Sequence, residues 1–346
     1  MSKDQSTILH LPPNSLILKA MSFHQSNSSA ETPRLVVPQL EAGEEWLSII
    51  LHFSNAALSV SGPDATSPIS SRFELSNDFW IEHLDPSLAK AIVDACSPAN
   101  FRTPAIQQQD HTYAFVKKTR LPGLFDDFGG LDELAAIVAL SRLIHLTTTG
   151  FRYSARVSMV NGDLKQILAF QPRGVTVDVF CSKAERRDWL TEVDALRLKS
   201  LMPLILTRKL LPKRIHNAHW HHEYAVRTYY IDHRWVFIIT GLEALMNTGR
   251  YQGQKRFVSR VGRLANIVGV NISTTDLERG YALRSGLVHG QQFLSEQSNR
   301  LSDADADLYD LLEEILRRNV LHAFEDDSFA AHFHDEQSID AFLPYP

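Results

Sequence analysis

The sequence predicts an α+β protein in two parts: an N-terminal domain of mixed strands and helices, residues 1–183, and an all-helical C-terminal domain, residues 184–346. In the first part, β-rich apolar runs alternate with helical stretches. From about residue 184, apolar residues recur almost only at helical spacing. The chain has 346 residues, of which 44% are hydrophobic and 22% charged, which is the composition of a globular protein. That length suits two domains of about 150 residues each.

Strands are predicted in the first part wherever apolar and β-branched residues cluster. Those segments are Trp46–Val60, Thr112–Lys118, Arg152–Val160, Asp163–Phe170 and Val175–Phe180. The third and fourth are separated by Asn161-Gly162, a pair that accepts positive φ at both central positions of a turn. We therefore expect a tight hairpin there. Two helices, Pro86–Cys96 and Leu131–Leu146, are expected between the strands.

The second part reads as a succession of amphipathic helices. The expected helices are Ala184–Leu211, Ile215–Tyr230, Asp232–Asn247, Lys255–Val268, Thr274–Val288 and Asp303–Phe324. Pro212 ends the first, Thr275 with Glu278 has the pattern of a capping box, and Ser302 precedes the acidic start of the last. Apolar stripes with a period of 3.6 residues give each helix one buried face, as in a helical bundle.

Charge is distributed unevenly along the C-terminal part. Residues 201–300 hold 14 basic and six acidic residues, a net charge of +8, whereas residues 301–346 hold two basic and 12 acidic residues, a net charge of −10. A basic body with an acidic end suits binding of a polyanion that the end restrains. Mutual neutralisation of helix faces within the fold explains the same pattern, and both interpretations stay open.

The remaining composition indicates a cytoplasmic protein. Cys96 and Cys181 are too few and too far apart for a disulfide framework. The first thirty residues lack the pattern of a secretory signal, and Trp235–Met246 is too short and too polar for a membrane span. We expect no membrane association and no cofactor.

Metal-capable side chains are densest at His219, His221, His222 and Glu223. His219 and Glu223 lie one helical turn apart, a spacing that zinc can use, but the HExxH pattern is absent and no cysteine is close. A metal-dependent hydrolase therefore requires His219, His221 and Glu223 to converge with a further ligand. We expect no metal site.

The most informative segment is Thr274–Gln291, in which Arg284 precedes His289 by five positions. That spacing alone is a weak signal, because Arg214 and His219, Arg227 and His233, and Arg317 and His322 are similarly spaced. Context decides. The strings Gly241–Leu245, Arg260–Leu264, Tyr281–Gly290 and Leu312–Arg317 resemble, in order and spacing, the helices of a HEPN domain of the ApeA-like group, over roughly residues 215–335.

The resemblance implies a helical bundle that dimerises and acts as a metal-independent endoribonuclease in stress or anti-phage defence. It implies that Arg284 and His289 of two protomers meet in one composite catalytic site, with Glu243 in a supporting role. The N-terminal domain would then sense a signal or restrain the enzyme. The rival interpretation is a non-catalytic HEPN module for dimerisation or RNA binding, in which His289 caps its helix and Arg284 pairs with Glu243.

The residue types suit that chemistry on their own. Histidine exchanges protons near neutral pH, so His289 can deprotonate a ribose 2′-OH or protonate the departing 5′ oxygen. The guanidinium of Arg284 can stabilise the negative charge that develops on the attacked phosphate. Five residues of ideal helix turn about 500°, which leaves the two side chains about 140° apart. They converge only if the helix ends near Gly286–Gly290 or a second protomer completes the site.

Further residues are expected to contact RNA. Arg256, Arg260 and Arg263 fall at helical spacing and form a basic stripe that suits sequence-independent phosphate binding. Ser285 occupies a position where related motifs often carry a polar residue, so the resemblance implies that it orients a phosphate; the alternative is a plain helical serine. A solvated helix face explains the stripe equally well. We expect Tyr281 to belong to the core.

Overall fold

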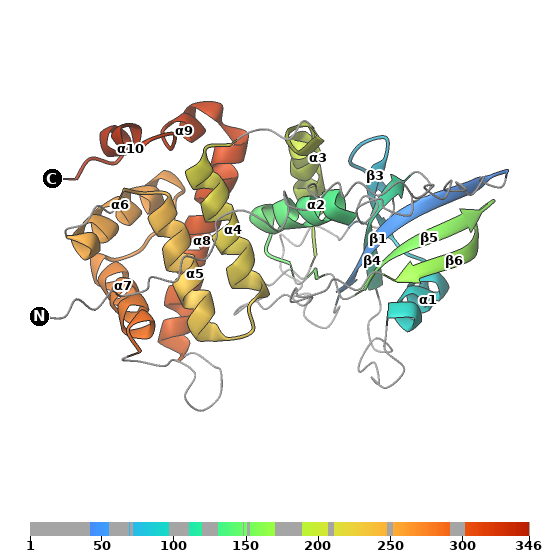
Figure 1. The fold of residues 1–346 in the computed structure, drawn as a ribbon, viewed down its shortest axis with the longest axis horizontal. Coiled ribbons are helices and arrows are strands. Elements are labelled where there is room, and N and C mark those ends of the chain that lie inside the picture. Colours follow the sequence, from blue (N-terminus) through green and yellow to red (C-terminus); the bar gives the residue numbers. More distant parts are fainter. Residues whose placement is uncertain are drawn as a thin grey trace, which may run out of the picture.

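The structure is a computed structural model, shown in Figure 1, in which the sheet and the helical bundle lie at opposite ends of the molecule. It describes residues 42–54, 69, 72–96, 111–119, 131–147, 149–150, 153–169, 189–206, 211–247, 252–290 and 302–345. Within these ranges the chain combines an antiparallel sheet with helices, so the mixed α/β class is confirmed. No helix in the described ranges combines the length and the apolar character that a membrane crossing demands.

The sheet in the described ranges has six strands, all paired antiparallel, in the order β2-β3-β4-β1-β5-β6. Their bounds are β1 Glu44–Ser54, β2 Phe73–Glu74, β3 Phe79–His83, β4 His111–Thr119, β5 Ser154–Val160 and β6 Asp163–Ala169. The sequence predicts β1, β4, β5 and β6 but misses β2 and β3. The expected strand Val175–Phe180 lies outside the described residues.

The β5–β6 connection is the tight turn that the sequence predicts. Asn161 has φ 52° and Gly162 has φ 90°, so both central residues of the turn are left-handed. The turn matches the right-handed twist of the flanking strands and fixes the pairing of Val160 with Asp163.

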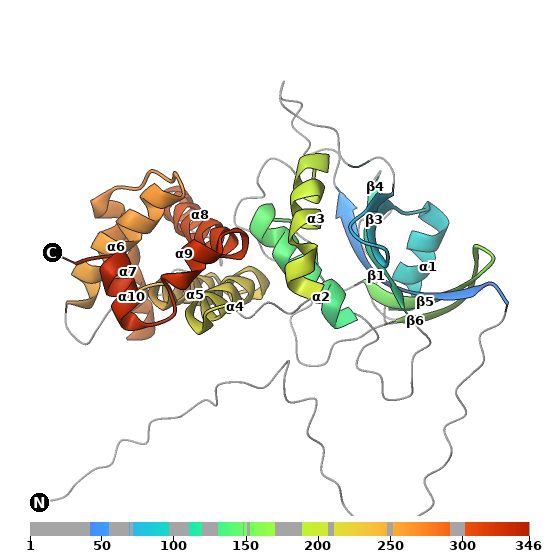
Figure 2. The same cartoon turned by 90° about the horizontal axis from the view of Figure 1, so that it is seen from above.

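The sheet has a hydrophobic cluster on each face, because successive side chains of a strand point to opposite sides. Leu47, Ile49 and Leu51 of β1 pack on one side with α1 (Pro86–Cys96). Ile50 joins the cluster on the other side, which includes α2 (Leu131–Ile144). Figure 2 shows α1 on one face, and α2 and α3 between the other face and the bundle. The cluster on the α2 side continues into the bundle.

Helix α3 spans Glu192–Leu206, which corrects the expected start at Ala184. Trp189–Thr191 is not helical, whereas residues 184–188 and 207–210 lie outside the described ranges. The start is fixed by a reciprocal cap: the Thr191 amide donates to the Asp194 carboxylate at 2.9 Å, and the Asp194 amide donates to the Thr191 hydroxyl at 3.2 Å.

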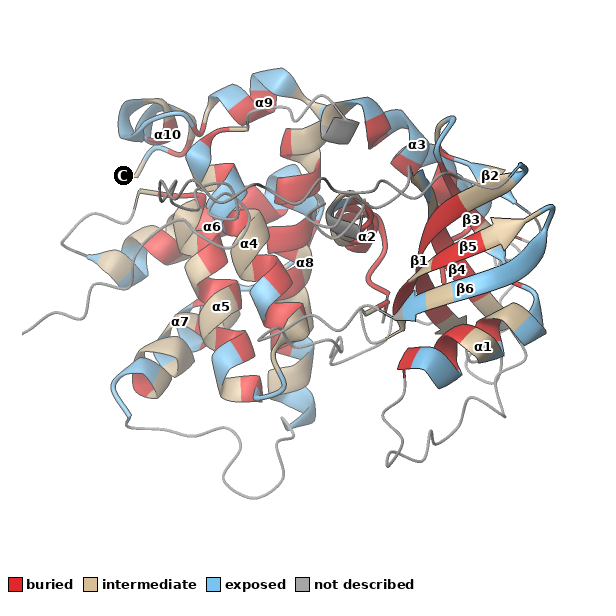
Figure 3. Cartoon of the chain, turned by 45° about the vertical axis from the view of Figure 1, so that its right-hand side comes forward, coloured by how far each residue is buried: buried red, intermediate tan, exposed pale blue. Residues whose placement is uncertain are grey.

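The bundle contains the five further helices that the sequence predicts, each within three residues of its expected bounds. They are α4 Lys213–Arg227, α5 Ile231–Ala244, α6 Gly253–Ile267, α7 Thr274–Val288 and α8 Asp303–Glu325. Two short helices that the sequence does not predict follow, α9 Asp327–Ala331 and α10 Glu336–Phe342. Figure 3 shows buried residues along the inward faces of these helices.

The caps of the last long helices differ in one detail from expectation. Ser273, rather than Thr275, caps α7, because its hydroxyl accepts from the Asp276 amide at 3.0 Å. Ser302 caps α8 as predicted and accepts from the Asp305 amide at 3.2 Å.

A buried polar network joins the sheet side to the bundle. Arg142 of α2 donates from Nε and Nη2 to the two carboxylate oxygens of Glu223 on α4, at 3.1 and 2.5 Å. Arg317 of α8 donates to the carbonyl oxygens of Leu143 and Ile144 at the end of α2. Because a buried charge is costly without its partner, these contacts fix how α2 sits on the bundle.

Candidate functional site

The candidate site is built around an ion pair between α5 and α7. Arg284 of α7 donates from Nη2 to Oε2 of Glu243 on α5 at 2.9 Å. The side chains are 24% and 17% exposed, so the pair is partly shielded from water. Glu243 is the second-last residue of α5 and belongs to the Gly-Leu-Glu-Ala-Leu segment that the sequence singles out. The structure therefore brings together two of the three expected catalytic residues.

The electrostatics of the pair reflect its partial burial. Burial raises the pKa of Glu243, and the positive charge of Arg284 opposes that rise. Tyr281, one turn before Arg284, also has a raised pKa, first through burial and then through the Glu243 charge. The buried Nε of Arg284 has no hydrogen-bond partner in the described residues. Within the described part of the chain, the hydrogen bond from Nη2 to Glu243 thus orients Arg284.

His289 lies directly after the last residue of α7, where the sequence analysis expects the helix to end. The helix ends at Val288, His289 is the C-cap with φ −89° and ψ 5°, and Gly290 follows in the left-handed region with φ 67°. The expected ending near Gly286–Gly290 is confirmed. The His289 side chain is exposed, so it can reach a molecule in solution.

Within one chain, His289 and Arg284 do not meet directly. No hydrogen bond or ion pair joins their side chains among the described residues, whereas the His289 amide donates to the Ser285 carbonyl at 3.0 Å. Ser285, which lies between Arg284 and His289 in the sequence, is half-buried.

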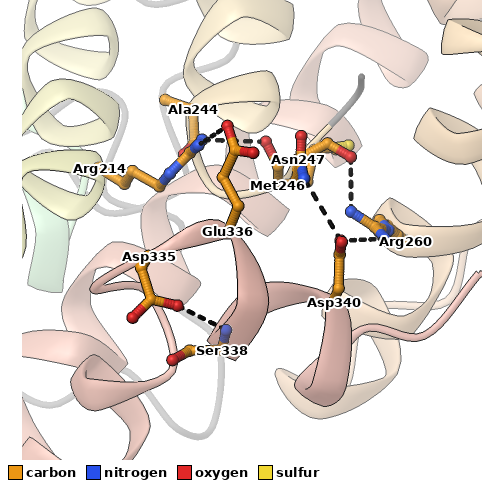
Figure 4. Close-up of polar contacts among 9 residues, drawn as sticks. All are labelled: Arg214, Ala244, Met246, Asn247, Arg260, Asp335, Glu336, Ser338 and Asp340. Atoms are coloured by element: carbon orange, nitrogen blue, oxygen red, sulfur yellow. Dashed lines mark hydrogen bonds and ion pairs between the residues drawn. The ribbon is translucent and has the colours of Figure 1, made fainter. Parts of the chain in front are cut away.

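The structure corrects the expected basic stripe at Arg260. Arg260 is only 2% exposed, and its guanidinium donates to the Asn247 carbonyl at 2.5 Å and to Asp340 at 2.6 Å. Figure 4 shows Asp340 of α10 facing Arg260 and Asn247. Since its charge is neutralised inside the fold, Arg260 is not available to a phosphate in this structure. Its role is to hold α10 against α6 and the end of α5.

The other two stripe residues differ from Arg260. Arg263 is exposed, as the stripe requires. Arg256 is half-buried; its guanidinium carbon lies 5.4 Å from the centroid of the Tyr345 ring, and its buried Nε has no partner among the described residues. Of the expected stripe, Arg263 presents its charge most openly.

The acidic C-terminal segment packs as part of the bundle. In Figure 4, Glu336 of α10 pairs with Arg214 of α4, which also donates to the Ala244 and Met246 carbonyls at the end of α5. On the same short helix, Ile339 is fully buried. Of the two interpretations of the charge pattern, these contacts match neutralisation within the fold. The sequence predicts the excess of acidic residues in this segment, but it does not predict which arginines form ion pairs with them.

The histidines and glutamate of α4 are engaged in separate contacts. Glu223 is paired with Arg142, and His222 Nε2 lies 2.7 Å from Glu313 Oε1 on α8. His219 packs edge-on to Phe324, and His221 stacks against Phe237. In the described ranges, no group of three His, Cys, Asp or Glu side chains is placed to hold a metal ion. The convergence that a metal-dependent hydrolase requires at His219, His221 and Glu223 is therefore not seen there.

Comparisons of the chain with family models, with curated proteins and with solved structures give no match. Its function is accordingly inferred from the residues and geometry described above.

Proposed function

We propose that the chain is a metal-independent endoribonuclease of the HEPN type, active as a cytoplasmic homodimer in stress or anti-phage defence. The observation that carries the proposal is the end of α7. There, Arg284 is oriented by the Glu243 carboxylate at 2.9 Å, and His289 stands exposed where the helix stops. The role in defence rests on the family resemblance alone.

The proposed chemistry assigns one task to each residue. His289 either takes the proton of the ribose 2′-OH or gives a proton to the departing 5′ oxygen, and water exchanges the other proton. The attack of the 2′ oxygen on phosphorus forms the cyclic phosphodiester as the P–O5′ bond breaks. Arg284 donates hydrogen bonds to the phosphate oxygens that gain negative charge, and Glu243 holds the guanidinium in position. The products are a 2′,3′-cyclic phosphate and a 5′-hydroxyl.

Dimerisation completes the proposed site. The family resemblance implies that the ends of α7 from two protomers together supply Arg284 and His289 at one phosphate. The exposed Arg263 of α6 would contact a neighbouring phosphate of the RNA.

One observation favours a second candidate function. The Arg284–Glu243 ion pair and the C-cap position of His289 also suit a non-catalytic HEPN module for dimerisation or RNA binding. In that module the two residues stabilise the bundle and the dimer, and RNA is bound but not cut.

Product analysis separates the two candidates. The full-length wild type is incubated with end-labelled single-stranded RNA and with DNA of the same sequence, and the product ends are identified. The ribonuclease gives 2′,3′-cyclic phosphate ends from RNA and leaves DNA intact, because DNA lacks the 2′-OH. Intact RNA in a sample that binds RNA supports the module. Cleavage of both nucleic acids, or 5′-phosphate products, contradicts the proposed mechanism.

A further inference from the structure

A set of aromatic rings covers part of α4 and α5. We define the aromatic face as His216, Trp220, His221, Tyr224 and Phe237. Along α4, ring centroids are 6.0 Å apart from His216 to Trp220 and 5.8 Å apart from Trp220 to Tyr224. Phe237 of α5 extends the set, 5.6 Å from Tyr224 and 6.1 Å from His221. The rings form a continuous path across the α4–α5 hairpin.

Part of the aromatic face reaches the surface. Tyr224 is 46% exposed, His216 is exposed and Trp220 is half-buried. The other four tryptophans are all buried, namely Trp46, Trp80, Trp189 and Trp235. Trp220 is also held in place, because its Nε1 donates to His216 Nε2 at 2.8 Å. A ring that is fixed before binding loses little conformational freedom on contact with a ligand.

The charges around the aromatic face suit an anionic ligand. α4 carries Lys213, Arg214 and Arg227, and its single acidic residue, Glu223, is buried against Arg142. Arg227 lies near Tyr224, because the tyrosine acts electrostatically on the pKa of the guanidinium. The Arg214 charge is paired with Glu336 of α10. Rings on a helix that carries the exposed Lys213, and whose single carboxylate is buried, match a polyanion whose own units have flat aromatic faces. Single-stranded nucleic acid has that chemistry.

The aromatic face is also next to the proposed catalytic helices. Figures 1 and 2 both place α5 between α4 and α7, and α5 packs against each of them. Phe237 and Glu243 both lie on α5. Six residues of ideal helix separate Phe237 from Glu243 by about 9 Å along α5 and by about 120° around it. A strand would therefore have to pass around α5 to contact both the rings and the Arg284 region.

We propose that the aromatic face is a platform on which the bases of single-stranded RNA stack. The choice of RNA rests on the proposed function, whereas the stacking surface rests on the rings and charges of α4 and α5. Stacking uses the face of a base, so it tolerates any sequence. In a duplex the bases are already stacked on one another. The proposed substrate is therefore unpaired RNA.

Trp220 reports on the platform directly, because it is the one tryptophan of the chain that is not buried. The full-length His289→Ala variant, which we expect not to cut, is titrated with a mixed-sequence single-stranded RNA oligonucleotide while tryptophan emission is recorded. A DNA oligonucleotide of the same sequence serves as an uncleavable probe, and the RNA duplex as the paired form. We expect saturable quenching by both single strands and none by the duplex.

The contribution of each ring to RNA affinity is measured in variants, by the fluorescence anisotropy of a labelled single-stranded oligonucleotide. Trp220→Ala and Tyr224→Ala should each weaken binding about tenfold, and Trp220→Phe, which keeps a ring, should retain most of the affinity. Leu196→Ala is the matched control, because Leu196 is an exposed apolar residue of α3 without a ring. Unchanged affinity in both alanine variants, or equal quenching by duplex and single strand, overturns the proposal.

Two further outcomes separate this inference from the proposed function. Quenching without any RNA cleavage by the wild type leaves the platform in place and contradicts the ribonuclease. Cleavage that Trp220→Ala does not impair, without quenching, supports the ribonuclease and overturns the platform. A blue shift of Trp220 emission that depends on protein concentration alone also overturns it, since a second copy of the chain would then cover the rings.

Discussion

The Arg284 guanidinium on α7 and the Glu243 carboxylate on α5 form a hydrogen-bonded ion pair at 2.9 Å, in a partly buried position. The two residues are 41 positions apart in sequence, so the contact fixes how α7 crosses α5. The contact engages the Nη2 nitrogen of the guanidinium. Both the catalytic and the structural interpretation of Arg284 depend on this contact.

A double-mutant cycle measures the ion pair. Arg284→Met, Glu243→Gln and the double variant are unfolded in urea at neutral pH. We expect a coupling free energy of about 1 kcal/mol, because the pair is partly screened by water. A coupling near zero would mean that Glu243 does not hold Arg284 in solution. In RNA cleavage, Glu243→Gln should retain more activity than Arg284→Met, since the amide oxygen can still accept from the guanidinium.

Arg260 and Arg263 should behave differently although they lie one turn apart on α6. Arg263→Ala should leave the free energy of unfolding unchanged. The affinity of this variant for RNA should depend less on salt, with a slope of log affinity against log salt that is about 1 smaller in magnitude. Arg260→Met should destabilise the fold by about 2–3 kcal/mol, because Asp340 and the Asn247 carbonyl lose their donor. Equal loss of RNA affinity in two folded variants would restore Arg260 to the stripe.

Because His219 has a lowered pKa, we expect the free energy of unfolding to fall in mild acid. Burial lowers the pKa of His219 to about 4, although the charge of Glu223 acts in the opposite direction. In the unfolded chain the pKa is about 6.5, so between these values the unfolded state binds more protons. The free energy of unfolding should therefore fall as pH drops from about 6.5 to 4, by at most about 3 kcal/mol from this residue.

The His219→Gln variant tests that assignment, because it removes the titrating ring. Urea unfolding across the same pH range should show a shallower decline than in the wild type. Parallel curves for His219→Gln and the wild type would show that His219 is not the group responsible.

Two helical glycines should respond oppositely to alanine. A Cβ at Gly241 of α5 would lie 2.6 Å from Leu316 Cδ2 and 3.2 Å from the His221 Cβ, so Gly241→Ala should destabilise by about 1–3 kcal/mol. A Cβ at Gly262 of α6 would have its nearest contact at 3.6 Å, and alanine has the better helix propensity. Gly262→Ala should therefore stabilise by about 0.5–1 kcal/mol. Thermal unfolding of both variants checks the contrast.

Periodicity and turn chemistry predict the elements whose signals are local. The helix Thr274–Val288 and the Asn161-Gly162 turn follow directly from neighbouring residues, and the structure confirms both. The strands Phe73–Glu74 and Phe79–His83 are missed, because runs of two and five residues are too short for an alternating pattern to stand out.

Long-range pairing limits what the sequence shows of the candidate site. The pairing of Arg284 with Glu243, which the sequence analysis expects in the non-catalytic interpretation, is present. Helical spacing placed Arg260 on a basic stripe, but it does not reveal that Asp340, 80 positions later, covers it. The aromatic face likewise combines i, i+4 spacing on α4, which the sequence contains, with Phe237 of the next helix, which only packing brings there.

The central claim, RNA cleavage by His289 without a metal, is tested most directly by incubating labelled single-stranded RNA with purified protein in EDTA. The wild type and His334→Ala, a matched exposed histidine, should both cut and leave 2′,3′-cyclic phosphate ends. His289→Ala, folded to the same extent by urea unfolding, should lose at least about 100-fold in rate. Cleavage by His289→Ala at the wild-type rate, or no cleavage by a folded, dimeric wild type that binds the RNA, would contradict the claim.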